Sequence, residues 1–201
     1  YAYERCAAER GHCIVAGVDE AGRGPLAGPV AVAAVILPQE YLLPRLNDSK
    51  KLSEKVREEL YERIVSDAVS YHVELIDAET IDRMNILEAT RKGMYDAVAA
   101  LLPTPQEVLV DAVTLPHLRM ASQSIVKGDA KSASIAAASV LAKVTRDRLM
   151  LTYDEAYPLY GFAKHKGYGT QEHIDAIRNY GICPLHRKTF EPIRSMITKE
   201  S

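Results

Sequence analysis

Two short apolar runs near the start of the chain restrict the possible folds most strongly. Residues 14–18 and 30–37 consist mainly of Val, Ile, Ala and Leu, and a Gly- and Pro-rich segment separates them. Runs of this kind predict two neighbouring, buried strands. Both are far shorter than the roughly 20 apolar residues that span a bilayer, so we expect no membrane-spanning helix.

Further strand and helix signals alternate along the chain. An Ala-rich segment without Gly or Pro predicts one long helix from residue 130 to about residue 157, and the pattern from Thr170 to Gly181 predicts a last helix. Other helices are expected to start near Ser53, Asp77 and Asn85. The predicted strands are residues 14–18, 30–37, 70–76, 107–111 and 123–129. This order predicts an α/β fold with a mixed sheet flanked by helices and a helical C-terminal part.

The composition limits the class of protein and its compartment. The 201 residues fit one domain, and 47% hydrophobic with 26% charged residues is ordinary for a soluble protein. The three cysteines, Cys6, Cys13 and Cys183, form no C-x-x-C pair, which argues against a disulfide framework or a zinc knuckle. We expect a reducing, cytoplasmic location, since the charged start does not resemble a signal peptide. The net charge of −2 means that any nucleic-acid contact needs a local basic surface.

Acidic residues at the ends of predicted strands are the main chemical signal. Asp19 and Glu20 follow the first strand, while Asp111 and Asp129 end two later ones. If the first and fourth strands are parallel neighbours, these carboxylates share the edge of the sheet where α/β folds usually bind ligands. Carboxylates 4 Å apart repel each other by roughly 4 kcal/mol at an effective dielectric constant near 20, so the group needs a cation. Oxygen ligands favour Mg²⁺ or Mn²⁺ over zinc.

Structural roles compete with the metal site at two of the four acids. Asp129 could instead be the N-cap of the long helix, and Asp111 could be a turn residue. The adjacent pair Asp19 and Glu20 has no obvious structural role, so a metal site is the favoured interpretation of all four. None of the six histidines forms an H-E-x-x-H or similar pair.

A turn formed by Gly22, Arg23 and Gly24 follows the first two acids. Backbone N–H groups without Cβ obstruction, beside a guanidinium, suit phosphate or ribose oxygens, although a plain hairpin turn is the alternative. Tyr168, between two glycines, could stack on a sugar or base, or could pack in the core. Basic residues in nearby segments would form a phosphate-binding surface or a solvated face, and they include Lys50, Lys143 and Arg146.

Four long motifs together closely resemble the bacterial ribonuclease HII family. They are "GVDEAGRGPLAGPVAVAAVIL", "LNDSKKLS", "IVKGDAKSASIAAASVLAKVTRDRLM" and "YGFAKHKGYGTQEHIDAIRNYGICPLHRKTF". The resemblance covers residues 14–190, which is nearly the whole chain. It implies a ribonuclease H-like fold with a five-stranded mixed sheet and helices on both sides. We expect a single catalytic domain over residues 1–201, with a helical C-terminal extension from about residue 160.

The resemblance also implies an activity. The family consists of endonucleases that cut RNA in RNA–DNA hybrids and nick DNA duplexes on the 5′ side of an embedded ribonucleotide, leaving 3′-OH and 5′-phosphate ends. Such nicking belongs to ribonucleotide removal from DNA. The expected partners are therefore RNA–DNA hybrids and ribonucleotide-containing duplexes, without a membrane, and nothing in the sequence requires more than a monomer.

The resemblance assigns roles to individual residues. It implies that the acids bind the divalent metal, at Asp19, Glu20, Asp111 and Asp129. The Gly22–Arg23–Gly24 motif is expected to contact the ribose 2′-OH and nearby phosphates, and Tyr168 to stack at the RNA-to-DNA junction. Phosphate contacts are expected from Lys50, Lys143 and Arg146.

Two other functions are alternatives. A DNA junction resolvase of the ribonuclease H-like group shares an acidic metal site, but we do not expect it to combine "GRG" with "KGYG". A non-catalytic nucleic-acid binding module would use the acids as caps and turns, so its binding would not respond to chelators.

Overall fold

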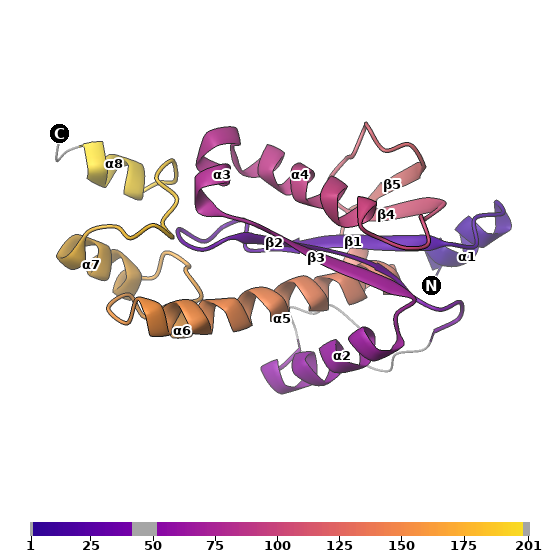
Figure 1. Ribbon diagram of the computed structural model, residues 1–201, viewed down its shortest axis with the longest axis horizontal. Helices are drawn as coiled ribbons and strands as arrows, with labels where there is room; N and C mark the ends of the chain where they lie inside the picture. Colours follow the sequence, from indigo (N-terminus) through magenta and orange to yellow (C-terminus); the bar gives the residue numbers. More distant parts are fainter. Residues whose placement is uncertain (1, 42–51, 199–201) are drawn as a thin grey trace.

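The computed structural model describes residues 2–41 and 52–198. A five-stranded mixed sheet lies between two layers of helices (Figure 1). Its strands are β1 Val15–Ala21, β2 Val30–Ile36, β3 Ser70–Ile76, β4 Glu107–Asp111 and β5 Ala121–Ile125. The helices are α1 Ala2–Glu9, α2 Glu54–Asp67, α3 Ala78–Met84, α4 Ile86–Ala99, the 3-10 turn η2 Gly128–Ala130, α5 Ala133–Ala156, α6 Phe162–His165, α7 Gln171–Tyr180 and α8 Ile193–Thr198. This architecture confirms the predicted α/β fold class.

The order of the strands in the sheet is β3-β2-β1-β4-β5. β1 pairs with β2 in antiparallel orientation, and β2 pairs with β3 in the same way. On its other side β1 is parallel to β4, which is parallel to β5. The predicted parallel pairing of the first and fourth strands is therefore confirmed, and the carboxyl ends of β1 and β4 lie at the same edge of the sheet.

Each face of the sheet has its own hydrophobic core. Successive side chains of a strand point to opposite faces, and every residue of β2 is buried. Val32 and Ala34 belong to the core that includes α4, whereas Ala33 and Val35 belong to the core that includes α2 and α5. Figure 1 shows α3 and α4 on one side of the strands and α2 and α5 on the other. Because helices cover both faces of the sheet, the side chains on both faces of β2 are buried. This explains why residues 30–36 do not alternate between apolar and polar types.

The long helix α5 packs very closely on β1 at Gly17. A Cβ atom added at Gly17 would lie 2.0 Å from the carbonyl carbon of Ser134 and 2.4 Å from the backbone nitrogen of Ile135. Only glycine permits this backbone approach. The contact brings the first turns of α5 alongside the strand that carries Asp19.

Several helix starts agree with the sequence, and some boundaries do not. The first strand runs to Ala21 rather than ending at residue 18, so Asp19 and Glu20 lie within it instead of after it. Ser53, Asp77, Asn85 and Thr170 all accept N-cap hydrogen bonds as predicted. The predicted strand 123–129 is wrong in its bounds, because β5 pairs with β4 over Ala121–Ile125. The long helix starts at Ala133 rather than residue 130, since the Ser132 hydroxyl accepts the capping hydrogen bond from Ile135 N–H.

The C-terminal helices form a third cluster at one end of the sheet. Residues of α6 and α7 pack there with Leu26 and Ala27, which belong to the turn between β1 and β2. Figure 1 shows α7 and α8 at the end opposite α1. Helix α7 confirms the predicted last helix, whereas α1, α6 and α8 were not predicted. Within residues 2–41 and 52–198, no helix is both long and apolar enough to cross a membrane.

Candidate active site at the carboxyl ends of the central strands

The register of the parallel strands places two of the predicted acids side by side. Val18 of β1 pairs with Val110 of β4, so the next residues, Asp19 and Asp111, occupy adjacent positions on neighbouring strands. Their side chains leave the same face of the sheet because residues in register on adjacent strands share a face. Asp19 and Asp111 therefore lie together at the carboxyl-terminal edge of the sheet, where the sequence predicted both of them.

Asp19 is a buried carboxyl group near the end of β1. Its side chain is buried, with 3% exposure, and Oδ1 accepts a hydrogen bond of 2.7 Å from the Glu20 N–H. The pKa of Asp19 lies well above its ordinary value, chiefly because burial disfavours the charged form and also because the charges of Glu20 and Asp111 repel it. Among the described residues, none provides a hydrogen bond to its buried Oδ2. The ionised form of Asp19 is therefore disfavoured in the protein alone, and a nearby positive charge would stabilise it.

Asp129 reaches this edge of the sheet through a 3-10 turn rather than through a strand. The Gly128 N–H donates a hydrogen bond of 2.7 Å to Oδ1 of Asp111, which connects the turn to the end of β4. Asp129 follows directly and is buried. The alternative in which Asp129 caps the long helix is wrong, since Ser132 is the cap.

The acids do not enclose an ion by themselves. In the part of the chain that the structure describes, no three Asp, Glu, His or Cys side chains are close enough together to form a complete metal site. Glu20 is partly turned toward Arg23, whose Nη1 lies 3.4 Å from Glu20 Oε1. A bound Mg²⁺ usually has few protein ligands and keeps several other oxygen ligands, so the arrangement suits an ion shared with substrate and water.

A cleft next to these acids contains most of the other predicted residues. It has a volume of about 290 Å³, and we call it the Tyr168 cleft. Its lining residues are Glu20, Ala21, Gly22, Arg23, Gly24, Ser139, Lys143, Arg146 and Tyr168. A larger cavity of about 440 Å³ lies beside α1, and none of the predicted site residues lines it. The position of the predicted site residues therefore identifies the smaller cleft as the candidate substrate site.

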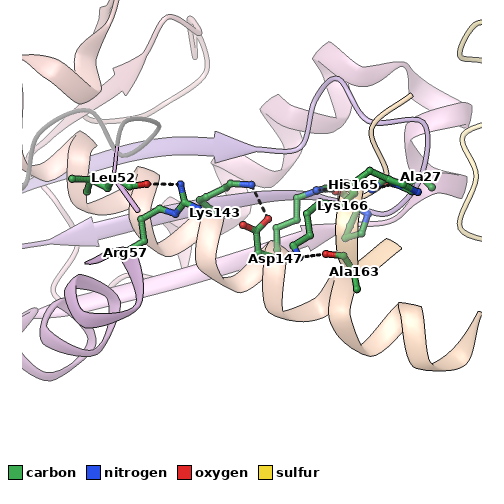
Figure 2. A network of polar contacts seen from close by, with 11 residues as sticks. Ala27, Leu52, Arg57, Lys143, Asp147, Ala163, His165 and Lys166 are labelled. Carbon is green, nitrogen blue, oxygen red and sulfur yellow. Dashed lines mark hydrogen bonds and ion pairs between the residues drawn. The ribbon is translucent and has the colours of Figure 1, made fainter. Parts of the chain in front are cut away.

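The Lys143 side chain belongs to the Tyr168 cleft and is held by its own helix. Its Nζ lies 2.7 Å from Oδ1 of Asp147, one turn later on α5. Figure 2 shows this pair close to the turn that carries His165 and Lys166. The position is compatible with the predicted phosphate contact. The other lysine predicted for that role, Lys50, lies outside the described residues.

The Gly22–Arg23–Gly24 turn is held from behind by Arg187, a residue that the sequence analysis did not single out. The Arg187 side chain is fully buried and donates hydrogen bonds of 2.6 Å to the Gly22 carbonyl and 2.9 Å to the Arg23 carbonyl. Two more, of 3.0 and 2.8 Å, go to the Gly28 carbonyl. Burial and the charge of Arg146 lower the pKa of Arg187 to about 9, so it is charged at neutral pH.

The placement of Arg146 requires a correction to the predicted phosphate contact. Its side chain is 1% exposed, and its guanidinium donates to the carbonyl groups of Pro29, Lys166 and Ala27 at 2.9, 2.9 and 3.1 Å. It also lies against Gly22, where an added Cβ would come within 2.0 Å of Nε. These partners are all internal, so Arg146 shapes the wall of the cleft instead of facing a substrate.

Three histidines behind Tyr168 were also missed by sequence analysis. His165, His173 and His186 are all at least 93% buried, and their spacings of 8 and 13 residues match no metal-binding or catalytic motif. Burial lowers the pKa of His173 and of His186 to about 4. Both are therefore neutral at pH 7.

Because His173 and His186 are buried in their neutral form, we expect the folded protein to lose stability in mild acid. As the pH falls from about 6.5 towards 4, the unfolded chain takes up protons that the folded chain excludes, which costs up to about 1.4 kcal/mol of unfolding free energy per pH unit for each histidine. We expect His173→Asn to be less stable than the original chain at pH 7, and this difference to narrow at pH 5. Urea unfolding at both pH values, with exposed His117→Gln as control, measures it. A difference that stays constant would contradict neutral burial of His173.

The chain is similar to known proteins of one family. The ribonuclease HII family model matches residues 16–193. The chain is 57% identical over 194 residues to the ribonuclease HII of Bacillus velezensis, covering 96% of this chain and 76% of that protein. Identity to the ribonuclease HII of Acetivibrio thermocellus is 55% over 188 residues, covering 94% and 73%. The crystal structure of the ribonuclease H2 from Pyrococcus horikoshii matches with a TM-score of 0.79 at 27% identity and covers 92% of this chain and 98% of that chain.

The matched segment contains both the acids and the Tyr168 cleft. It begins before Asp19 and ends after Arg187, so the comparison includes every described residue of the candidate site. The similarity to the solved structure extends over 92% of this chain, so it is not confined to one part of the fold. The chain belongs to the ribonuclease HII family and is an endoribonuclease that acts on the RNA of RNA–DNA hybrids.

Proposed function

We propose that this endoribonuclease depends on a divalent cation, Mg²⁺ or Mn²⁺, and that it also nicks duplex DNA on the 5′ side of a single embedded ribonucleotide. The observation that carries the proposal is the pair Asp19 and Asp111 on adjacent strand ends, with the Tyr168 cleft beside them. Product ends with 3′-OH and 5′-phosphate groups are part of the same proposal.

The acids fit a cation on physical grounds. The buried Oδ2 of Asp19, for which the described residues supply no hydrogen-bond donor, has a geometry suited to a metal ligand. Repulsion from Glu20 and Asp111 would become attraction to a shared positive charge. We propose Asp19, Glu20, Asp111 and Asp129 as the residues that hold the ion. When bound, a divalent cation supplies charge neutralisation for the phosphate and activates water.

The Gly22–Arg23–Gly24 turn supplies the proposed contact to the ribose hydroxyl. Arg187 binds the carbonyl groups of Gly22 and Arg23. In a planar trans peptide the N–H points opposite to the C=O, so the N–H groups of Arg23 and Gly24 point away from Arg187. A polar group positioned for a 2′-OH discriminates against deoxyribose, because the missing hydroxyl leaves that group unpaired.

Tyr168 and Lys143 complete the proposed substrate contacts. The Tyr168 side chain is 46% exposed, although its Cε1 lies only 3.7 Å from the Cβ position that Gly24 would have. An exposed ring beside a sugar-binding turn suits stacking on the sugar or base at the junction. Lys143 offers a positive charge for a neighbouring phosphate.

We also infer a single catalytic domain that works as a monomer in a reducing cytoplasm. All proposed ligands come from one chain. The three cysteines are free thiols, which is compatible with that compartment.

Cation removal provides the test. With a labelled duplex that contains one ribonucleotide, we expect one nick on its 5′ side in Mg²⁺ or Mn²⁺, no nick in EDTA, and recovery when excess Mg²⁺ is restored. An otherwise identical all-DNA duplex and a DNA four-way junction serve as controls. Cleavage of the junction but not of the ribonucleotide would favour a resolvase. Tight binding without cleavage at any Mg²⁺ concentration would favour a binding module.

A further inference from the structure

Three buried histidines form one cluster directly beneath the turn that carries Tyr168. The rings of His165 and His173 stack with their centroids 4.4 Å apart, and those of His173 and His186 are 5.2 Å apart. Phe162 packs against all three rings. The metal-binding role proposed for the acids does not use this cluster.

The hydrogen bonds of two of these histidines run in one direction. His173 Nδ1 lies 2.9 Å from the Tyr168 carbonyl, which can only accept, so Nδ1 carries the proton. The two Nε2 atoms are 3.1 Å apart, so His173, protonated on Nδ1, accepts through Nε2 and His186 donates through its own Nε2. Nδ1 of neutral His186 then accepts, and the Cys183 N–H at 2.9 Å is its donor; this contact is shorter than those of 3.2 and 3.3 Å to Sγ and the carbonyl oxygen of Cys183.

We call the series of hydrogen bonds from Cys183 through His186 and His173 to Tyr168 the histidine relay. His165, beside it, also has one donor contact and one acceptor contact. Its Nε2 donates to the Tyr160 carbonyl at 2.7 Å, and its Nδ1 accepts from the Gly167 N–H at 3.2 Å. Each of the three rings therefore has one defined tautomer. Adding a second proton to any of them would set two donors against each other.

The backbone around Tyr168 needs contacts from other parts of the chain to hold one conformation. Tyr168 lies between Gly167, with φ +86°, and Gly169, and glycines leave the backbone free to adopt many conformations. With its ring 46% exposed, core packing does not fix its place. The Tyr168 N–H donates to the His165 carbonyl at 2.9 Å, and the Tyr168 carbonyl accepts from the Thr170 N–H at 2.8 Å and from His173 Nδ1 at 2.9 Å. The contact from His173 connects this backbone to the relay.

The opposite end of the relay is connected to the Gly22–Arg23–Gly24 turn. His186 forms a β-bridge with Ala27, and the next residue is Arg187, which binds the Gly22 and Arg23 carbonyl groups. One short segment therefore anchors both walls of the Tyr168 cleft.

We propose that His173 and His186 are positioning residues that set Tyr168 at a fixed place relative to the Gly22–Arg23–Gly24 turn, and thereby favour cutting at a single embedded ribonucleotide. This inference rests on the proposed function. A substrate with a run of ribonucleotides can bind in several equivalent positions along the site. A substrate with one ribonucleotide has a single RNA-to-DNA junction, which must lie at one position relative to Tyr168. Selectivity for the single ribonucleotide is thus the property that the relay controls.

A double-mutant cycle with Tyr168 tests this role. The variants are His173→Leu, Tyr168→Ala and the two combined, and kcat/KM is measured on a duplex with one ribonucleotide and on a continuous RNA–DNA hybrid. We expect His173→Leu to lower cutting of the single ribonucleotide about tenfold more than cutting of the hybrid, since small misplacements of a positioning group have large effects. In the Tyr168→Ala background the same substitution should produce no further selective loss.

Conservative and control variants separate positioning from folding. His173→Asn keeps an N–H near the Nδ1 position, so we expect it to recover most of the selectivity. Exposed His117→Ala should leave both activities unchanged. Equal selective losses from His173→Leu with and without Tyr168 would overturn the inference, even if single-ribonucleotide nicking itself is confirmed. Wild-type protein that does not nick the single ribonucleotide would instead overturn the proposed function.

The tautomers provide a measurement that needs neither activity nor a variant. In ¹⁵N NMR spectra of the imidazole groups at pH 7, we expect His173 protonated on Nδ1, and His165 and His186 protonated on Nε2. His173 protonated on Nε2 would overturn the relay.

Discussion

The substitution Asp19→Asn should abolish strand cleavage, by about a thousandfold or more, and at the same time raise the melting temperature of the metal-free protein. The loss of activity follows from removal of a ligand that cation-assisted hydrolysis requires. The gain in stability follows because burial and the charges of Glu20 and Asp111 disfavour the Asp19 carboxylate, and an amide removes that charge. For a chain of this size, about 1 kcal/mol corresponds to roughly 2–4 °C.

Thermal unfolding in EDTA and in Mg²⁺ tests this prediction together with the cleavage assay. The original chain should melt at a higher temperature in Mg²⁺ than in EDTA, whereas Asp19→Asn should show a smaller shift or none. Asp96→Asn, at an exposed ion pair with Lys92, is the control and should change neither property. Normal cleavage rates in Asp19→Asn would remove Asp19 from the proposed metal site.

The substitution Arg187→Ala should produce the largest loss of stability, about 3–5 kcal/mol, because it leaves the buried carbonyl groups of Gly22, Arg23 and Gly28 without donors. This corresponds to a decrease of about 10 °C or more in melting temperature. Cleavage should decrease by at least about a hundredfold under conditions where the variant is folded, since the turn proposed to contact the ribose loses its support.

Arg178→Ala is the matched control for this substitution. Arg178 is exposed and pairs only with Asp175 on its own helix, so its removal should change stability by less than about 0.5 kcal/mol. Arg187→Lys adds a second comparison, because one ammonium group cannot reach three carbonyl groups in the planar geometry of a guanidinium. If Arg187→Ala were as stable as Arg178→Ala, the buried hydrogen bonds would not support the turn.

The strand-end acids were predictable because their signal is local. Asp111 is the last residue of β4, and Asp19 follows the apolar part of β1, two residues before that strand ends. The assumption that the two strands are neighbours placed them together. Asp129 shows the limit of this reasoning. Its segment has strand-like residues, but pairing with β4 fixes β5 at Ala121–Ile125, and the chain enters a 3-10 turn before Asp129.

The residues that shape the cleft were not predictable in the same way. Arg146 on a helix looks like a phosphate-binding residue, and only tertiary structure shows that backbone carbonyl groups surround it. Arg187 has no local signal, because its partners precede it by 159 to 165 residues. Charge patterns thus reveal where ionic groups occur along the chain, whereas burial determines whether they face solvent or the protein interior.

The great separation between Arg187 and its partners also has a consequence during translation. The turn after the first strand leaves the ribosome 164 to 165 residues before the guanidinium that binds its carbonyl groups. A nascent chain that already contains all four proposed metal ligands therefore still lacks the hydrogen bonds of Arg187, and the turn proposed to contact the ribose becomes fixed only after that residue is added.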